Sequence, residues 1–321
     1  MHFPVSGVYC AVWIPPLVAF VISSLTASAG VSGAFLLLPF QMSVLGFTSP
    51  SVSPTNLIYN IVAIPGGVYR YIKEGRMAWP LTWTVVSGTL PGVVVGAIIR
   101  IRYFPDPRSF KLFVGLVLLL LGIKILLEFI KPPSKTHPDR ETIEKKFQAE
   151  VSRARNGGTL RAGLSKDAVI RTRSISWRKI EYEFWNESFA FNPIAVFSLA
   201  LAVGLVGGVY GIGGGAIIAP FVVAVLAMPV YVVAGAALSG TLITSVAGVA
   251  CFELLALTPL AQGQVVRPDW ALGTLFGVGG LFGTYLGARI QKFIPERLIR
   301  LLLAGLSMML AVQYIGQFLW I

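Results

Sequence analysis

The chain has 321 residues, of which 55% are hydrophobic and only 12% are charged, and its mean hydropathy is +0.76. Soluble domains carry about a quarter charged residues, so this composition excludes an ordinary soluble protein and indicates several apolar spans of about 20 residues. The net charge of +12 does not indicate nucleic-acid binding, because Lys and Arg lie in connectors and one polar insert rather than on a basic stripe with stacking aromatics.

Ten apolar segments follow one another along the chain, five on each side of the polar insert. In chain order they are 8–29, 31–47, 53–72, 79–101, 109–130, 193–210, 212–228, 230–256, 269–290 and 297–320. We therefore predict an all-α membrane protein with a first membrane repeat at 1–130, a polar cytoplasmic insert at 131–192 and a second membrane repeat at 193–321.

A glycine-rich interruption separates the first two segments of each half. Gly30-Val31-Ser32-Gly33 leads into Pro39, and Gly211-Ile212-Gly213-Gly214-Gly215 leads into Pro220 at an offset of 181 residues. Paired interruptions of this kind are typical of transporters built from internal repeats. Each pair of segments is expected either to span twice or to form a re-entrant hairpin.

The similarity between the halves continues beyond these glycines. Gly88–Ala97 matches Gly279–Ala288 at an offset of 191, and both contain small-xxx-small patterns, Gly92-xxx-Gly96 and Gly283-xxx-Gly287. Such patterns predict close helix packing. Because each unit has an odd number of spans, the two repeats are expected to be inverted relative to each other.

The polar insert predicts the orientation of the chain in the membrane. Residues 131–192 contain 13 Lys and Arg against 8 Asp and Glu, which favours a cytoplasmic location, with both termini outside. Ile180, Tyr182 and Phe184 alternate with Glu181 and Glu183, the period of a half-buried strand. We expect a multi-pass protein of the plasma membrane, of the prokaryotic inner-membrane kind, with a small cytoplasmic appendage.

The two interruptions also predict a binding site. A helix that starts at a break in lipid directs unpaired N–H groups and partial positive charge into the gap, and this arrangement binds anions without a basic side chain. Glycine lets the backbone approach a ligand closely, although glycines that only allow tight helix packing remain an alternative. The third segment of each half adds a polar helix face, whose alternative role is hydrogen bonding between helices. The predicted substrate-binding residues are Gly30, Ser32, Gly33, Asn56, Asn60, Gly211, Gly213, Gly214, Gly215, Thr241, Thr244 and Ser245.

Other chemistry is poorly supported by the sequence. Glu253 is a candidate for proton coupling, because intramembrane carboxylates are often functional, or it reaches the headgroups from a helix end. The isolated Cys and His residues predict no metal site, and no cofactor is expected. No catalytic constellation is present, so we do not expect an enzyme.

The glycine motif resembles that of a known family. Gly204–Gly215 (GLVGGVYGIGGG), followed by Pro220, Pro229 and Gly240-Thr241, is similar to the TauE/SafE sulfite exporter family. Asp269-Trp270 and Gly287-Ala288-Arg289 extend the resemblance, whereas the first half departs from it with Ser32 where a glycine is usual. The resemblance implies secondary transport of sulfite, thiosulfate or organosulfonates such as sulfoacetate.

We therefore expect a secondary transporter for a small sulfur-containing anion, working by alternating access. Its expected partners are that anion and the lipid bilayer, with a homodimer left open and no nucleic acid. Two alternatives remain, a passive anion channel that uses the same glycine turns and a membrane scaffold that binds a partner through the insert.

Overall fold

The computed structural model describes residues 1–28, 31–73, 75, 77–130, 170–184, 187–215, 218, 221–222, 230–290 and 296–319. Within these ranges the protein is mostly helical, and four helices are long and apolar enough to cross a membrane. The helices are α1 (Ile14–Ser28), α2 (Ala34–Ser43), α3 (Val52–Ala63), α4 (Pro65–Lys73), α5 (Trp79–Tyr103), α6 (Pro107–Ile130), α8 (Pro193–Tyr210), α10 (Val230–Leu255), α11 (Trp270–Ile290) and α12 (Glu296–Leu319), with a 3-10 turn η2 (Pro259–Ala261).

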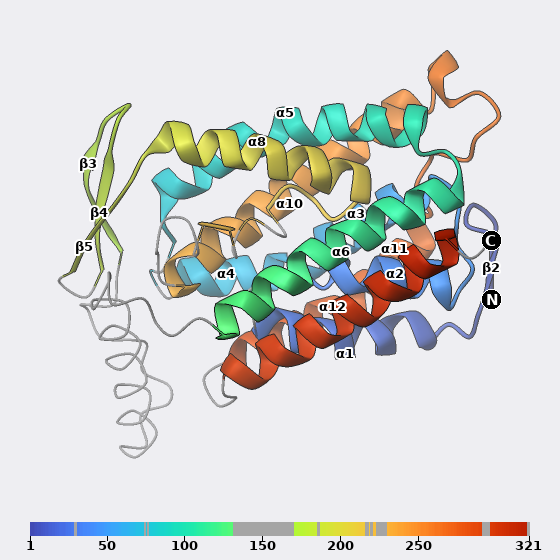
Figure 1. Ribbon diagram of the computed structural model, residues 1–321, viewed down its shortest axis with the longest axis horizontal. Helices are drawn as coiled ribbons and strands as arrows, with labels where there is room; N and C mark the ends of the chain where they lie inside the picture. The colour runs from blue at the N-terminus through green and yellow to red at the C-terminus, as the bar shows by residue number, and fades with distance from the viewer. Residues whose placement is uncertain are drawn as a thin grey trace.

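The long helices form one elongated bundle with two distinct ends (Figure 1). Both chain termini lie at one end, here called the terminal end. A three-stranded sheet lies at the opposite end, here called the sheet end.

The long helices of each half pack mainly against helices of the other half. Taken in sequence order, α1 corresponds to α8, α5 to α11 and α6 to α12. Helix α1 packs mainly against α11, and α8 packs mainly against α5. Helices α6 and α12 pack against each other, while α3 contacts both α10 and α11. Neither half therefore has a self-contained core.

The predicted small-xxx-small patterns lie in these contacts, and the prediction of close packing is confirmed. A methyl group added to Gly92 of α5 would lie 2.5 Å from the carbonyl oxygen of Leu201 in α8. An equivalent methyl on Gly283 of α11 would meet the carbonyl oxygen of Phe20 in α1. Backbones approach this closely only where side chains are absent.

A proline inside α2 makes one half depend on the other. Pro39 has no N–H, so the carbonyl of Phe35 loses its helical donor. The hydroxyl of Tyr210, at the end of α8, donates to that carbonyl at 3.0 Å. The hydroxyl of Tyr314 in α12 donates to the carbonyl of Pro39 at 3.1 Å. Side chains of the second half therefore satisfy carbonyl groups of the first, as an apolar surrounding requires.

Three predicted segments differ from the observed elements. The segment 53–72 is two helices, because Pro65 has no N–H with which to continue the ladder past Ile64. The segment 8–29 begins with strand β2 (Val8–Tyr9), which pairs antiparallel with β1 (His2–Phe3), before α1 starts. Most of the segment 212–228 lies outside the described residues.

A carboxylate caps α6 at the terminal end. The side chain of Asp106 accepts hydrogen bonds from the Ser109 amide at 2.9 Å and the Ser109 hydroxyl at 3.1 Å. These bonds stabilise the ionised form and hold the pKa of the Asp106 carboxyl below its usual value. The connector between α5 and α6 is therefore fixed by an N-terminal cap.

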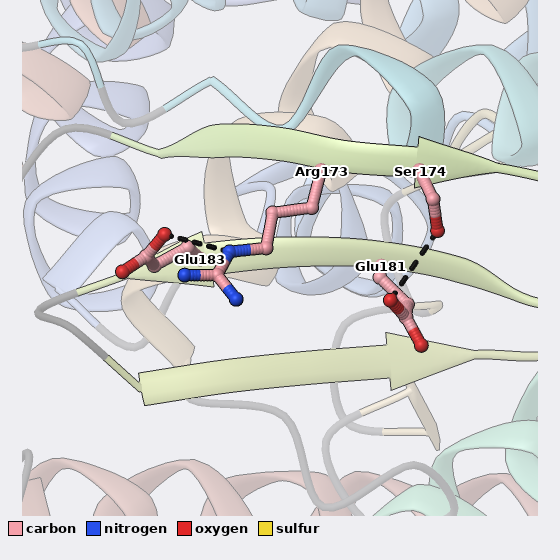
Figure 2. A network of polar contacts seen from close by, with 4 residues as sticks. All are labelled: Arg173, Ser174, Glu181 and Glu183. Carbon is pink, nitrogen blue, oxygen red and sulfur yellow. Dashed lines mark hydrogen bonds and ion pairs between the residues drawn. The ribbon is translucent and has the colours of Figure 1, made fainter.

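The expected strand in the insert is present and belongs to an antiparallel sheet of order β3-β4-β5. The strands are β3 (Arg171–Ile175), β4 (Ile180–Phe184) and β5 (Glu187–Phe191). Figure 2 shows the exposed face, where Arg173 contacts Glu183 at 2.9 Å and the Ser174 hydroxyl donates to Glu181 at 3.3 Å. Residues 131–169 of the predicted insert lie outside the described residues.

The buried face of β4 carries the alternate residues. Ile180 and Tyr182 are buried, as the alternation predicts. Glu181 points away and accepts from Lys179, which lowers the pKa of the Glu181 carboxyl. The sheet is tied to the helix bundle where the Ile170 amide donates to the carbonyl of Gly75 at 3.1 Å.

Candidate functional site

The helical ladder is interrupted at both predicted breaks. Helix α1 ends at Ser28 and α2 begins at Ala34. Helix α8 ends at Tyr210, and its C-cap residue Gly211 has φ 85°, a left-handed conformation that glycine adopts readily. Gly213 has φ 76°. Gly30 lies outside the described residues.

Asn60 of α3 connects the two breaks directly. Its carboxamide oxygen accepts a hydrogen bond from the Ser32 hydroxyl at 2.6 Å. Its Nδ2 donates to the carbonyl of Ile212 at 2.9 Å and to the hydroxyl of Ser245 at 3.2 Å. One side chain therefore contacts the first break, the second break and α10.

Asn56 forms a parallel connection one helical turn earlier. Its Nδ2 donates to the carbonyl of Ala34 at 3.0 Å and to the carbonyl of Gly211 at 2.9 Å. Its oxygen accepts from Nε2 of Gln41 at 3.1 Å. Because residues four apart share one helix face, a single face of α3 carries both connections.

The polar face of α10 approaches the second break in the same manner. The amide of Gly214 donates to the Thr244 hydroxyl at 3.0 Å. A methyl group added to Gly213 would lie 2.8 Å from the Ser245 hydroxyl oxygen. Thr241 lies beside Gly215, and its hydroxyl donates to the carbonyl of Ala237 on its own helix at 2.8 Å.

Some contacts at the two breaks involve residues at corresponding positions of the two halves. Ser32 and Gly33 correspond to Gly213 and Gly214 at an offset of 181, and Asn56, Tyr59 and Asn60 correspond to Thr241, Thr244 and Ser245 at an offset of 185. A methyl group added to Gly33 would meet the Tyr59 hydroxyl, whereas the Gly214 amide donates to the Thr244 hydroxyl and a methyl group there would meet Thr89 of α5. Ser32 contacts Asn60 as Gly213 contacts Ser245. The surroundings of the two breaks are thus similar in part.

This network is sealed from solvent in the present conformation. Ser32 is 4% exposed, and the predicted polar side chains Asn56, Asn60, Thr241, Thr244 and Ser245 are 0% exposed. None of the polar side chains in these contacts is ionisable near neutral pH. Any charge bound here would therefore be met by dipoles alone.

Three backbone amides of the network have no partner among the residues that the structure describes. None of the hydrogen bonds among the described residues uses the amide of Ser32, Gly213 or Gly215. Ser32 and Gly213 occupy equivalent positions in the two breaks. Buried amides normally have a partner, so these groups are suited to an anionic ligand, which backbone N–H groups at helix starts bind well.

The structure places the predicted residues in two groups. The predicted break and helix-face residues that the structure describes lie at or beside the two breaks, although only Ser32, Gly211 and Ser245 bond directly to Asn56 or Asn60. Glu253 does not, because it lies eight residues beyond Ser245 on α10, which is about 12 Å along a helix. There it accepts from the Trp270 indole at 3.0 Å and lies 3.7 Å from Arg267.

Two members of the network were not predicted from the sequence. Gln41 is fully buried and is the single amide side chain within the apolar run of α2. That isolation is the signal that could have identified it. Tyr59 bonds the Ser23 hydroxyl at 2.6 Å beneath Gly33, and in the sequence it looks like an ordinary apolar position.

Comparison with known proteins identifies the family. A probable membrane transporter protein of Bacillus subtilis (strain 168), YunE, is 20% identical over 296 residues, which cover 90% of this chain and 91% of the relative. No solved structure matches the chain. The family model for sulfite exporter TauE/SafE matches residues 16–314. The chain therefore belongs to the TauE/SafE family of membrane transporters.

Proposed function

We propose that this protein is a secondary transporter that moves a small sulfur-containing anion across the plasma membrane by alternating access. Sulfite, thiosulfate and organosulfonates such as sulfoacetate are the candidate substrates. Membership of the sulfite exporter family supports this substrate class. In this proposal the anion binds between the two glycine breaks.

The observation that carries the proposal is the pair of connections made by Asn56 and Asn60. Each carboxamide contacts the first break or the helix that follows it, and each also contacts the second break. An anion between the breaks would replace some of these bonds with its own, and the amides of Ser32 and Gly213 would donate to its oxygens. Neutral donors suit a substrate that must also leave, because a buried fixed cation would bind it more strongly.

The exchange of helix partners supports an inverted repeat. Two units related by an axis in the membrane plane would place equivalent helices in equivalent contacts, as α1 with α11 and α8 with α5. Rocking of one half against the other would then open the sealed network alternately to the two sides. The present conformation, with its polar side chains buried, would be an occluded state on that path.

Transport by purified protein in liposomes tests this proposal. Radiolabelled sulfite, thiosulfate and sulfoacetate are each added outside, with and without an imposed proton gradient, and internal label is measured over time. Saturable uptake of at least one anion is the expected result. Absence of saturable flux for all three would contradict the substrate class.

The same liposomes separate a transporter from a passive channel. Accumulation of label above the external concentration in the presence of a gradient excludes a channel, whereas simple equilibration supports one. Deletion of residues 135–168, which leaves strand β3 intact, tests the scaffold alternative. Transport that survives this deletion would show that the insert is not required for the transport function.

A further inference from the structure

Arg100, near the end of α5, is a fully buried cation outside the polar network described above. It is 0% exposed. Its Nε donates to the Ser53 hydroxyl at 3.2 Å, and one terminal nitrogen donates to the carbonyl of Phe104. The guanidinium carbon lies 3.6 Å from the centre of the Phe110 ring.

The second terminal nitrogen of Arg100 has no hydrogen-bond partner among the residues that the structure describes. None of the ion pairs among the described residues involves Arg100. A buried charge without a counter-ion is strongly unfavourable, and a hydrophobic residue of similar size would be the more stable choice. A residue that weakens the fold in this way is expected to serve a function.

Arg100 is connected to the second break through one residue. The Ser53 hydroxyl that accepts from Arg100 donates in turn to the carbonyl of Val209 at 3.3 Å. A methyl group added to Gly211 would lie 2.5 Å from the Cα atom of Ser53. Ser53 therefore links the Arg100 guanidinium to the end of α8, where the second break begins.

We propose that Arg100 is an anion-binding residue on the route between the terminal end and the second break. Its free nitrogen donates to an oxygen of the transported oxyanion before the anion reaches, or after it leaves, the neutral donors of the break. Arginine suits this role because its planar donors match the oxygens of oxyanions and its charge is retained when buried. The inference rests on the proposed function, because the ligand is the transported anion.

The test compares Arg100→Gln with Arg102→Gln in the full-length detergent-purified protein. Arg102 lies two residues further along the same helix and is exposed, so this control removes the same charge without removing a buried donor. Sulfite affinity is measured by isothermal titration, and the melting temperature is measured without ligand.

Arg100→Gln is expected to weaken sulfite binding by at least about tenfold, the loss expected for one charge-assisted hydrogen bond. Its melting temperature is expected to stay unchanged or to rise, because an unpaired buried charge is removed. Arg102→Gln should bind sulfite within about twofold of the wild-type protein, since exposed charges act weakly. Arg100→Lys keeps the charge and should retain part of the affinity if Arg100→Gln cannot be purified.

The outcomes separate this inference from the proposed function. Wild-type protein that binds none of sulfite, thiosulfate and sulfoacetate would overturn both. Wild-type binding that Arg100→Gln leaves intact would overturn this inference alone. A fall in melting temperature with unchanged affinity in Arg100→Gln would assign Arg100 a purely structural role.

Discussion

Asn60 shows how a single side chain can couple two halves of a chain. It joins a hydroxyl 28 residues earlier to a carbonyl 152 residues later. In an apolar surrounding a donor or acceptor left without a partner costs about 1–3 kcal/mol, so the carboxamide fixes both breaks relative to α3. Any motion that separates the breaks must replace these bonds with others, and a bound anion is a suitable replacement.

Replacing Asn60 therefore tests both the stability and the transport function of the network. In Asn60→Ala the carbonyl of Ile212 and the Ser32 hydroxyl lose a partner, and we expect a loss of about 2 kcal/mol of stability together with a sulfite flux reduced at least about tenfold. Asn60→Ser places a hydroxyl at this position, like that of Ser245 at the corresponding position. Its stability and its sulfite flux should lie between those of the wild-type protein and of Asn60→Ala. Liposome flux and thermal unfolding measure the two effects. Wild-type flux in Asn60→Ala would remove Asn60 from the substrate path.

Gly213 and Gly263 form a matched pair for testing the second break. Their φ angles are 76° and 75°. An alanine at either position carries a left-handed strain of about 1–2 kcal/mol. At Gly213 the new methyl also meets the Ser245 hydroxyl at 2.8 Å, whereas at Gly263 no atom lies within 4 Å.

We expect Gly263→Ala to reduce stability modestly and to leave sulfite flux unchanged. Gly213→Ala should lower the melting temperature further and reduce flux, because the break must distort to accept the methyl group. Equal effects of the two variants on flux would indicate that the space beside Ser245 is not used. Thermal unfolding and liposome uptake of both variants, prepared side by side, make the comparison.

The sequence predicted the residues of the candidate site better than their connections. Glycines at breaks and hydroxyls at helical spacing are local patterns, and these identified Ser32, Asn60 and Ser245. The direction of the Asn60 carboxamide depends on packing between helices far apart in the chain, which no local pattern contains. The burial of Arg100 was not predicted, because a cation at a helix end usually reaches the membrane surface.

At the scale of elements, the fold rests on helix pairs held at backbone contact. Helices α5 and α8 meet along Gly88, Gly92 and Gly96, and α1 and α11 meet along Gly279, Gly283 and Gly287. Lipid offers little hydrophobic drive for helix association, so close contact and van der Waals packing must stabilise these pairs. The glycine spacing therefore specifies which helices associate.

A methyl group at Gly92 should separate α5 from α8. It would lie 2.5 Å from the Leu201 carbonyl oxygen and 2.7 Å from the Leu205 amide nitrogen, so we expect Gly92→Ala to lose about 1–3 kcal/mol by overpacking. Gly305→Ala in α12 is the control, because no atom lies within 4 Å of its added methyl. There alanine should be neutral or stabilise the helix by up to about 1 kcal/mol. Equal melting temperatures of Gly92→Ala and Gly305→Ala in thermal unfolding would contradict the packing role of Gly92.

Most helix bounds could be predicted because long apolar runs with charged or proline boundaries specify them locally. Helices α8 and α10 begin and end within a residue of the predicted segments. The division between α3 and α4 was missed, since hydropathy continues across Pro65 while the hydrogen-bond ladder does not. The pair β1 and β2 was missed because two-residue strands have no detectable period.

At the scale of the whole molecule, the two ends of the helix bundle differ in the segments that lie there. The terminal end holds both termini, while the sheet end holds β3, β4 and β5 (Figure 1). If the bundle crosses the membrane along its length, these ends face opposite compartments. The excess of Lys and Arg in the insert favours the cytoplasm for the sheet end.

Accessible cysteines test this orientation. Gln262→Cys, beside η2 at the terminal end, and Thr172→Cys, on β3, are both exposed positions, and Cys10 and Cys251 are replaced by alanine in the background. A membrane-impermeant maleimide added to intact cells should label Q262C and should label T172C only after lysis. Labelling of both from outside would place the two ends in the same compartment, and sulfite flux confirms that each variant is functional.

The exchange of partners between α1 and α11 has a consequence for biogenesis. The face of α1 that packs against the glycines of α11 has no partner until more than 240 further residues have been synthesised. That synthesis takes on the order of tens of seconds. Helix α2 also lacks, until they are synthesised, the hydroxyls of Tyr210 and Tyr314 that donate to its carbonyl groups near Pro39. We therefore expect the nascent first half to stay bound to the insertion machinery until α11 is made. A ribosome stalled before α11 should leave a partly folded chain that membrane proteases cleave.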